Sequence, residues 1–220
     1  MGKNQVLLET ERLVLRRFTQ DDAAHLFDLD SDPEVMRYLT GGTPTPRRVI
    51  ENDILPQFLR YDGRHPGFGF WAAIEQASGD FVGWFSFRPS DPADPRQAAL
   101  GFRLCRAAWG KGYATEGARA LIRLGFTELG VQRVIATTYQ DNAASRRVME
   151  KAGLELTRTY RLTPADLDHV DTYHVESQDL WDGDDVEYAL ERADWEYKED
   201  LWRSEASPDA ERISNSLIVE

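Results

Sequence analysis

The sequence predicts an α+β fold in a single domain, with helices packed against a central mixed, mostly antiparallel sheet of about seven strands. The chain has 220 residues, 41% of them hydrophobic, which is enough for one sizeable core. Alternating apolar and polar residues recur through the first half, as in antiparallel strands. A strand, a glycine-containing turn, an amphipathic helix and another strand then follow in order.

The first 61 residues are predicted to form one strand and three helices. Residues 7–18 alternate in the pattern of a strand. Thr19 and the acidic residues after it are typical of a helix N-terminus, and Asp32 followed by a proline begins a second, short helix. Residues 47–61 indicate a third helix, after a turn rich in glycine and proline.

The middle of the chain contributes three further strands. Residues 68–75 and 81–88 are rich in aromatic residues and are joined by a short hairpin connection. Residues 89–95 contain three prolines and predict a loop, and residues 98–105 predict the next strand.

The second half begins with an amphipathic helix and ends in acidic sequence. The helix runs from the glycine-containing turn to about Leu129, with apolar residues at spacings of three and four. A strand follows at residues 134–139, and Asn142 and Gly153 bound the next helix. Two last strands, at residues 154–162 and 186–190, are separated by an acidic insertion over residues 163–185. A short helix at residues 193–203 completes the domain. We expect one domain over residues 1–203 and a loosely held tail over 204–220.

Charge and composition exclude several classes of function. The net charge is −12, and residues 162–220 hold eighteen acidic against four basic residues. No basic patch of the kind that binds nucleic acid is present, and no apolar run approaches the ~20 residues that span a bilayer. The acidic part is either a solvated surface or a wall that attracts a cationic acceptor. The single cysteine, Cys105, and the lack of a signal-peptide pattern favour the cytoplasm.

The turn before the amphipathic helix is the main candidate binding site. Its residues are Trp109, Gly110, Lys111, Gly112, Tyr113 and Ala114. A helix N-terminus has unpaired amides and a partial positive charge, and small residues let a phosphate approach the backbone. Lys111 adds a cation. The spacing fits neither a P-loop nor a dinucleotide fingerprint, and a glycine-rich turn without a ligand remains the alternative.

This turn resembles the acyl-CoA pyrophosphate loop, Q/R-x-x-G-x-G/A, of the GNAT superfamily of N-acetyltransferases. Its version here, followed by Thr-Glu, is similar to that of the RimJ/RimL type, the ribosomal-protein alanine acetyltransferases. The resemblance covers residues 7–200 and extends to residues 11–16, 32–35, 100–104, 141–153, 186–190 and 194–195. It implies a sheet that splays between the fourth and fifth strands.

The resemblance also implies roles for single residues. Backbone around Phe102 and Leu104 would bind pantetheine and the acetyl carbonyl, and an N–H there would stabilise the oxyanion. Asn142 would both cap its helix and contact CoA. Ser145 would protonate the leaving thiolate, whereas its alternative is a local hydrogen bond in the first helical turn. Cys105 is expected to pack as a small apolar residue rather than to act as a nucleophile.

Two departures from the family pattern concern the chemistry. Trp109 stands where Arg or Gln is usual, and so offers no cation to CoA. Alanines at 98 and 99 stand where many relatives carry the carboxylate that serves as general base. The candidate bases are therefore Glu75, water, or groups of the acidic insertion, namely Asp171, His174 and Glu176. The four histidines show no metal-ligand spacing, and we expect no metal.

The function implied is transfer of acetyl from acetyl-CoA, as co-substrate, to an amine in a ternary complex. The amine is a small molecule or a protein N-terminus, and the resemblance is compatible with a homodimer. Two alternatives stay open. One is another acyl donor such as succinyl-CoA. The other is a degenerate fold that senses acyl-CoA, which the missing strand carboxylate favours.

Overall fold

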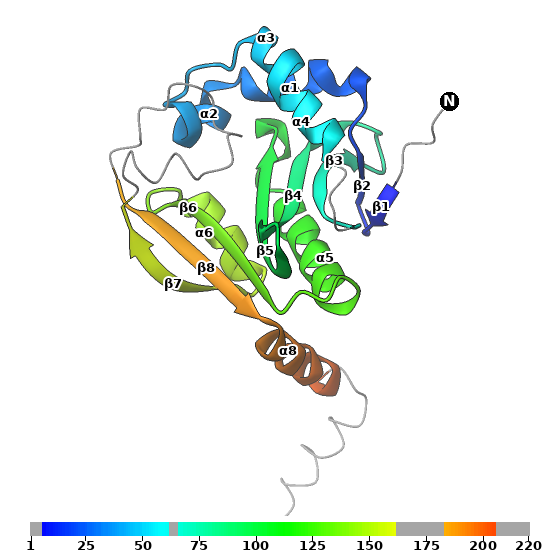
Figure 1. The fold of residues 1–220 in the computed structure, drawn as a ribbon, viewed down its shortest axis with the longest axis vertical. Coiled ribbons are helices and arrows are strands. Elements are labelled where there is room, and N and C mark those ends of the chain that lie inside the picture. The colour runs from blue at the N-terminus through cyan, green and yellow to red at the C-terminus, as the bar shows by residue number, and fades with distance from the viewer. Residues whose placement is uncertain (1–5, 62–65, 162–182, 206–220) are drawn as a thin grey trace, which may run out of the picture.

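The computed structural model describes residues 6–61, 66–161 and 183–205. Within these ranges eight strands form one sheet, in the order β1-β2-β3-β4-β5-β6-β8-β7. Every neighbouring pair is antiparallel except β5 and β6, which are parallel. The predicted α+β class and mostly antiparallel sheet are confirmed, with eight strands where about seven were expected (Figure 1).

The additional strand comes from the N-terminal segment, where one strand was expected and two are found. β1 (Val6–Glu9) and β2 (Leu13–Arg17) pair as a hairpin. Thr10 closes the turn, because its N–H donates to the Leu13 carbonyl at 2.8 Å and its hydroxyl accepts from the Leu13 N–H at 2.9 Å. Alternation continues through both arms, and the turn contains neither glycine nor proline. The pattern of alternating hydrophobic residues therefore does not reveal the turn between β1 and β2.

Helices of the first third cover one face of the sheet. They are η1 (Gln20–Asp22), α1 (Ala23–Asp30), α2 (Pro33–Thr40), α3 (Arg47–Val49), η2 (Ile50–Ile54) and α4 (Leu55–Arg60). The expected start of α2 is confirmed, since the Asp32 side chain accepts from the Glu34 N–H at 2.9 Å. The expected third helix has a π turn, η2, and Pro56 follows it without an N–H to continue the α pattern.

The central strands are β3 (Gly69–Glu75), β4 (Phe81–Asp91) and β5 (Asp94–Leu104). The loop expected at residues 89–95 is wrong, because β4 and β5 extend through it as a hairpin that pairs Asp91 with Asp94. Pro89 pairs with Ala98 in this ladder. A proline removes one donor but keeps an extended backbone, so the outlying end of a hairpin tolerates it.

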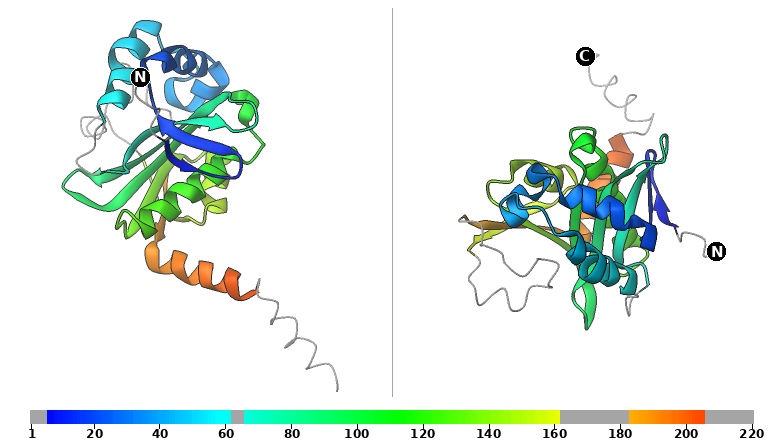
Figure 2. Two further views of the ribbon diagram at one scale, coloured as in Figure 1. Left: turned by 90° about the vertical axis from the view of Figure 1, so that its right-hand side faces the viewer. Right: turned by 90° about the horizontal axis from the view of Figure 1, so that it is seen from above.

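The opposite face of the sheet is covered by α5 (Tyr113–Thr127) and α6 (Ala143–Lys151). Gly117 and Gly125 let α5 lie close to the sheet, since a Cβ at either position would collide with Phe85 or Phe87 of β4. The principal core forms here, from residues such as Leu13, Phe85, Phe87, Leu121, Phe126, Val134 and Tyr188. A second core lies under α1–α4 and includes Phe18, Leu26, Ile50, Phe58 and Trp84. Figure 2 shows the sheet between these two layers.

The remaining strands are β6 (Arg133–Tyr139), β7 (Glu155–Tyr160) and β8 (Asp185–Glu191), all as expected to within a few residues. α8 (Arg192–Glu205) follows β8 and extends away from the sheet (Figures 1 and 2). Most of the expected acidic insertion, and the tail beyond residue 205, lie outside the described residues. No helix in the described ranges is long and apolar enough for a membrane span.

Candidate active site

The two parallel strands of the sheet separate along their length. β5 and β6 are paired only where residues 97–99 lie opposite residues 133–135. β5 nevertheless continues to Leu104 and β6 to Tyr139. The C-terminal half of β5 therefore has β4 on one side and an open edge on the other, which confirms the expected splay.

The backbone of Phe102 and Leu104 faces this open edge. The Arg96 carbonyl accepts from Gln132 N–H at 2.7 Å, on the β6 side, whereas Cys105 N–H donates to the Val82 carbonyl at 3.0 Å, on the β4 side. Successive residues of a strand point their backbone groups to alternate sides. Even-numbered residues of β5 consequently direct their N–H and C=O toward β6, and beyond Ala99 no residue of β6 pairs with them.

Trp109 fastens the end of β5 to the turn that follows. Its indole Nε1–H donates to the Leu104 carbonyl at 2.9 Å, while the side chain stays partly exposed. The aromatic residue that replaces the usual Arg or Gln thus has a structural contact of its own. The indole uses the Leu104 carbonyl as its hydrogen-bond acceptor, while the Leu104 N–H still points toward the open edge of β5.

The turn itself presents the uncapped start of α5. Gly110 and Gly112 have φ of 74° and 88°, in the left-handed region that favours glycine. Gly112 is the N-cap and has no side chain to cap with, and the first helical bond runs from Glu116 N–H to the Gly112 carbonyl at 3.0 Å. The amides of Tyr113, Ala114 and Thr115 therefore precede the helical hydrogen-bond ladder, where the helix dipole favours an anion.

Glu75, a candidate base, lies beside this turn rather than on the open edge. The Tyr113 hydroxyl donates a short hydrogen bond to its carboxylate, and the Ser78 hydroxyl donates another at 2.7 Å. These two bonds hold the pKa of Glu75 below its usual value, and the bond to Glu75 raises the pKa of Tyr113. A carboxylate stabilised in this way is a weaker base. The other candidates, Asp171, His174 and Glu176, lie outside the described residues.

Asn142 and Ser145 lie on α6, which begins directly after β6. The Asn142 side chain accepts from Ser145 N–H at 3.1 Å, so the predicted N-cap is confirmed. Ser145 is half-buried in the first helical turn. Both residues therefore lie just after β6, the strand that separates from β5.

Cys105 is half-buried among residues of the α1–α4 side. Its Sγ lies 3.9 Å from the Phe81 carbonyl. Burial raises the pKa of the thiol above its usual value, which reduces the thiolate fraction. This environment supports the interpretation of Cys105 as a packing residue.

Two ion pairs near the site were missed by sequence reasoning. On the α1–α4 side, Arg103 donates to Asp30 at 2.6 Å, and both side chains are buried. Arg103 also lies over the Trp84 ring, 5.2 Å from its centroid. The available sequence signal for Arg103 was the presence of one charged residue within an otherwise apolar strand segment. On the α5 side, Arg12 pairs with Glu116, and both lie in segments that carry the family resemblance.

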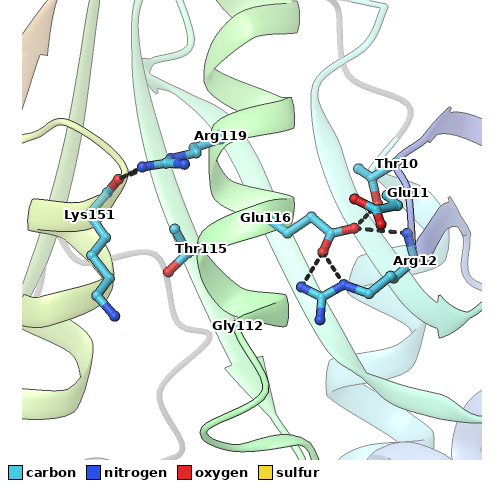
Figure 3. A pocket seen from close by; sticks show the side chains of 8 residues that line it. All are labelled: Thr10, Glu11, Arg12, Gly112, Thr115, Glu116, Arg119 and Lys151. Carbon is cyan, nitrogen blue, oxygen red and sulfur yellow. Dashed lines mark hydrogen bonds and ion pairs between the residues drawn. The ribbon is translucent and has the colours of Figure 1, made fainter.

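A surface hollow of about 490 Å³ opens beside the start of α5 (Figure 3). It is lined by Thr10, Glu11, Arg12, Gly112, Thr115, Glu116, Arg119 and Lys151. The Arg119 side chain donates to the Lys151 carbonyl at 2.6 and 3.0 Å, which joins α5 to the end of α6. In the described part of the chain, no group of three or more histidine, cysteine or acidic side chains could hold a metal ion.

Comparisons with known proteins agree with this geometry. A family model described as an acetyltransferase (GNAT) domain matches residues 12–155. The FsC-acetyl coenzyme A-N(2)-transacetylase of Aspergillus fumigatus is 34% identical over 200 residues, which are 88% of this chain and 79% of that protein.

Solved structures share the fold. A GNAT-family acetyltransferase from Bacillus anthracis superposes with a TM-score of 0.68 at 24% identity, over 84% of this chain and 98% of the other. RimL, a ribosomal L7/L12 α-N-protein acetyltransferase solved with coenzyme A, superposes with a TM-score of 0.66 over 85% of this chain and 98% of its own. At 16% identity this likeness shows the common fold and does not assign the subfamily.

Proposed function

The chain belongs to the GNAT acetyltransferase family, and we propose that it transfers an acetyl group from acetyl-CoA directly to an amine nitrogen in a ternary complex. The observation that carries this proposal is the juxtaposition of two unpaired backbone elements. The open edge of β5 ends at the turn that starts the uncapped α5. A thioester arm and a pyrophosphate need these two surfaces next to each other.

The cofactor would bind along these surfaces. The amides from Gly110 to Ala114 would receive the pyrophosphate, with Lys111 as a nearby cation. Arg119 and Lys151 supply positive charge in the adjoining hollow, which suits the remaining phosphate of CoA. The pantetheine amides would pair with the open edge at Phe102 and Leu104. Support comes from RimL, whose solved structure contains coenzyme A.

The reaction removes two protons from the acceptor nitrogen and supplies one proton to the leaving thiolate. After the ammonium loses a proton, the amine attacks the thioester carbonyl, and a β5 N–H stabilises the oxyanion. The C–S bond then breaks, and Ser145 protonates the leaving thiolate while Asn142 holds the start of α6. The nitrogen loses its second proton in this step, and that proton restores the Ser145 hydroxyl directly or through water. Since Glu75 is engaged by Tyr113 and Ser78, we assign removal of the ammonium proton to water or to the acidic segment.

The acceptor is the least constrained part of the proposal. The Aspergillus relative is named for transfer to N(2) of FsC, whereas RimL acts on a protein N-terminus. The first match is stronger in sequence and its name gives a different acceptor, so we favour an amine other than the protein N-terminus of the RimJ/RimL type. A cytoplasmic location and a homodimer stay predictions.

The proposal is tested by incubating the protein with acetyl-CoA or succinyl-CoA and a panel of amines. The panel holds small-molecule diamines, hydroxylated amines and peptides with a free N-terminal alanine or serine. Thiol release and the mass of each product are recorded. We expect an increase of one acetyl group on a small-molecule amine. Acetyl-CoA binding without release of CoA for any amine would contradict the proposal and favour a sensor.

A further inference from the structure

The N-terminal hairpin contacts the phosphate-binding turn through one arginine. The Arg12 guanidinium donates from Nη1 to the Lys111 carbonyl at 2.9 Å and from Nε to Glu116 at 2.7 Å, and Nη2 lies 2.5 Å from the same carboxylate. It also lies over the Tyr113 ring, 4.8 Å from the centroid. Figure 3 shows the Glu116 side chain extending from α5 toward Arg12, among the residues that line the hollow.

The contact with Lys111 determines where the next amide points. In a trans peptide the C=O and the following N–H point in opposite directions. Because Arg12 holds the Lys111 carbonyl, the N–H of Gly112 must point away from Arg12. A carbonyl turned toward a phosphate would repel it, and the Arg12 contact prevents this rotation at a glycine whose backbone is otherwise permissive.

The contact with Glu116 removes a competing charge. Glu116 lies in the first turn of α5, where a carboxylate interacts favourably with the dipole but would repel a phosphate at the same helix end. Arg12 and Thr10 satisfy this carboxylate, since the Thr10 hydroxyl donates at 2.6 Å and Arg12 N–H at 2.9 Å. Partial burial opposes its ionisation, but these bonds and the Arg12 charge together lower the pKa of Glu116 below its usual value, so it stays ionised beside its partner.

We infer that Arg12 is a positioning residue for the pyrophosphate of the acyl-CoA donor, because it orients the Lys111–Gly112 peptide and neutralises Glu116. This inference rests on the proposed function. It also accounts for the absence of a cation at Trp109, since the hairpin brings a guanidinium to the turn from a distant part of the chain. An exposed ion pair contributes little to stability, so a role in ligand binding is distinguishable from a structural one.

The test measures CoA binding by calorimetry for the wild type, Arg12→Met, Glu116→Gln and the double variant. Arg12→Met leaves the Glu116 carboxylate without its positive partner at the phosphate site and should weaken CoA binding at least tenfold. Glu116→Gln keeps the guanidinium at Lys111 and should bind CoA as tightly as the wild type or more tightly. The double variant should recover part of the affinity that Arg12→Met loses. Arg158→Met is the matched control, because it removes the exposed arginine of an arginine–glutamate pair between β7 and β8, away from the start of α5.

Turnover provides a second readout. Arg12→Met should raise KM for acetyl-CoA tenfold or more and leave kcat within about threefold, while turnover of S-acetylpantetheine, which lacks the pyrophosphate, stays near that of the wild type. Arg12→Lys keeps the positive charge but lacks the planar set of guanidinium donors, so it should lose less CoA affinity than Arg12→Met. Equal losses in Arg12→Met and Glu116→Gln, or no loss in a folded Arg12→Met, would overturn the inference. Failure of the wild type to bind CoA would instead overturn the proposed function.

Discussion

An arginine–carboxylate pair on one face of the sheet and another on the opposite face differ in burial. On the α1–α4 face, the side chains of Arg103 and Asp30 are 8% and 1% exposed. On the α5 face, those of Arg12 and Glu116 are 43% and 17% exposed. Breaking a buried pair leaves an uncompensated charge in the interior, whereas an exposed pair loses little. We therefore expect changes on the first face to act mainly on stability, and changes on the second to act mainly on ligand affinity and catalysis.

The largest effect is expected from Ser145→Ala on the α5 face. If Ser145 protonates the thiolate, the turnover rate should fall ~10²–10⁴-fold while acetyl-CoA affinity stays within a few-fold. Pre-steady-state CoA release at saturating substrate measures this directly. A fall in melting temperature with near-normal turnover would instead assign Ser145 to the helix end and break the comparison at this position.

Arg103→Met tests the opposite face. The variant leaves Asp30 buried and unpaired, so the free energy of unfolding should fall by about 3–5 kcal/mol. Urea unfolding of this variant beside Arg12→Met measures the contrast, since the exposed pair should contribute at most about 1 kcal/mol. Similar losses of unfolding free energy in both variants would show that the difference in burial does not determine how much each pair contributes to stability.

Glu75→Gln is expected to have a small effect on rate. Glu75 is engaged by Tyr113 and Ser78, so turnover should stay within about fivefold, far less than the ~10²-fold loss of a general base. The lowered pKa of Glu75 adds stability above the ordinary pKa of a glutamate, and this is lost as the pH falls through the lowered value. Glu75→Gln should flatten that acid limb in thermal unfolding. A hundredfold loss of turnover would make Glu75 the base.

Cys105→Ser should have the smallest effect. Its thiol is half-buried and its pKa is raised, so a covalent acyl-cysteine is not expected. Most of the activity should remain in a CoA-release assay. Loss of all turnover in a stable variant that still binds acetyl-CoA would require a covalent route.

The α5 face was the more predictable one, because its signals are local in sequence. The strand, the glycines at 110 and 112, and the Asn142 cap each act within a few residues, so turn and cap chemistry placed them. The pairs themselves were not predictable in this way. Arg103 and Asp30 are 73 residues apart, and Arg12 and Glu116 are 104 apart. Such contacts depend on the packing of the helices on the sheet.

The two errors in strand boundaries have the same kind of origin. The turn at Thr10 has no glycine or proline. The hairpin at residues 89–95 has three prolines, of which Pro89 and Pro95 lie in the strands and Pro92 lies in the turn. In both places the local composition predicts the wrong structure, because hydrogen-bonded pairing with the neighbouring strand, rather than composition, decides where the strand ends.

The central claim, that acyl-CoA binds at the start of α5, is tested most directly by calorimetric titration of acetyl-CoA into the wild type and Gly112→Asp. The substitution places a carboxylate where phosphate would approach, at a φ of 88° that favours glycine. Gly130→Asp is the matched control, since its φ is 74° and it lies beyond the other end of α5. We predict binding to the wild type and the control, with affinity reduced more than tenfold, or beyond ~1.4 kcal/mol, in Gly112→Asp. Unchanged affinity in a folded Gly112→Asp would contradict the account.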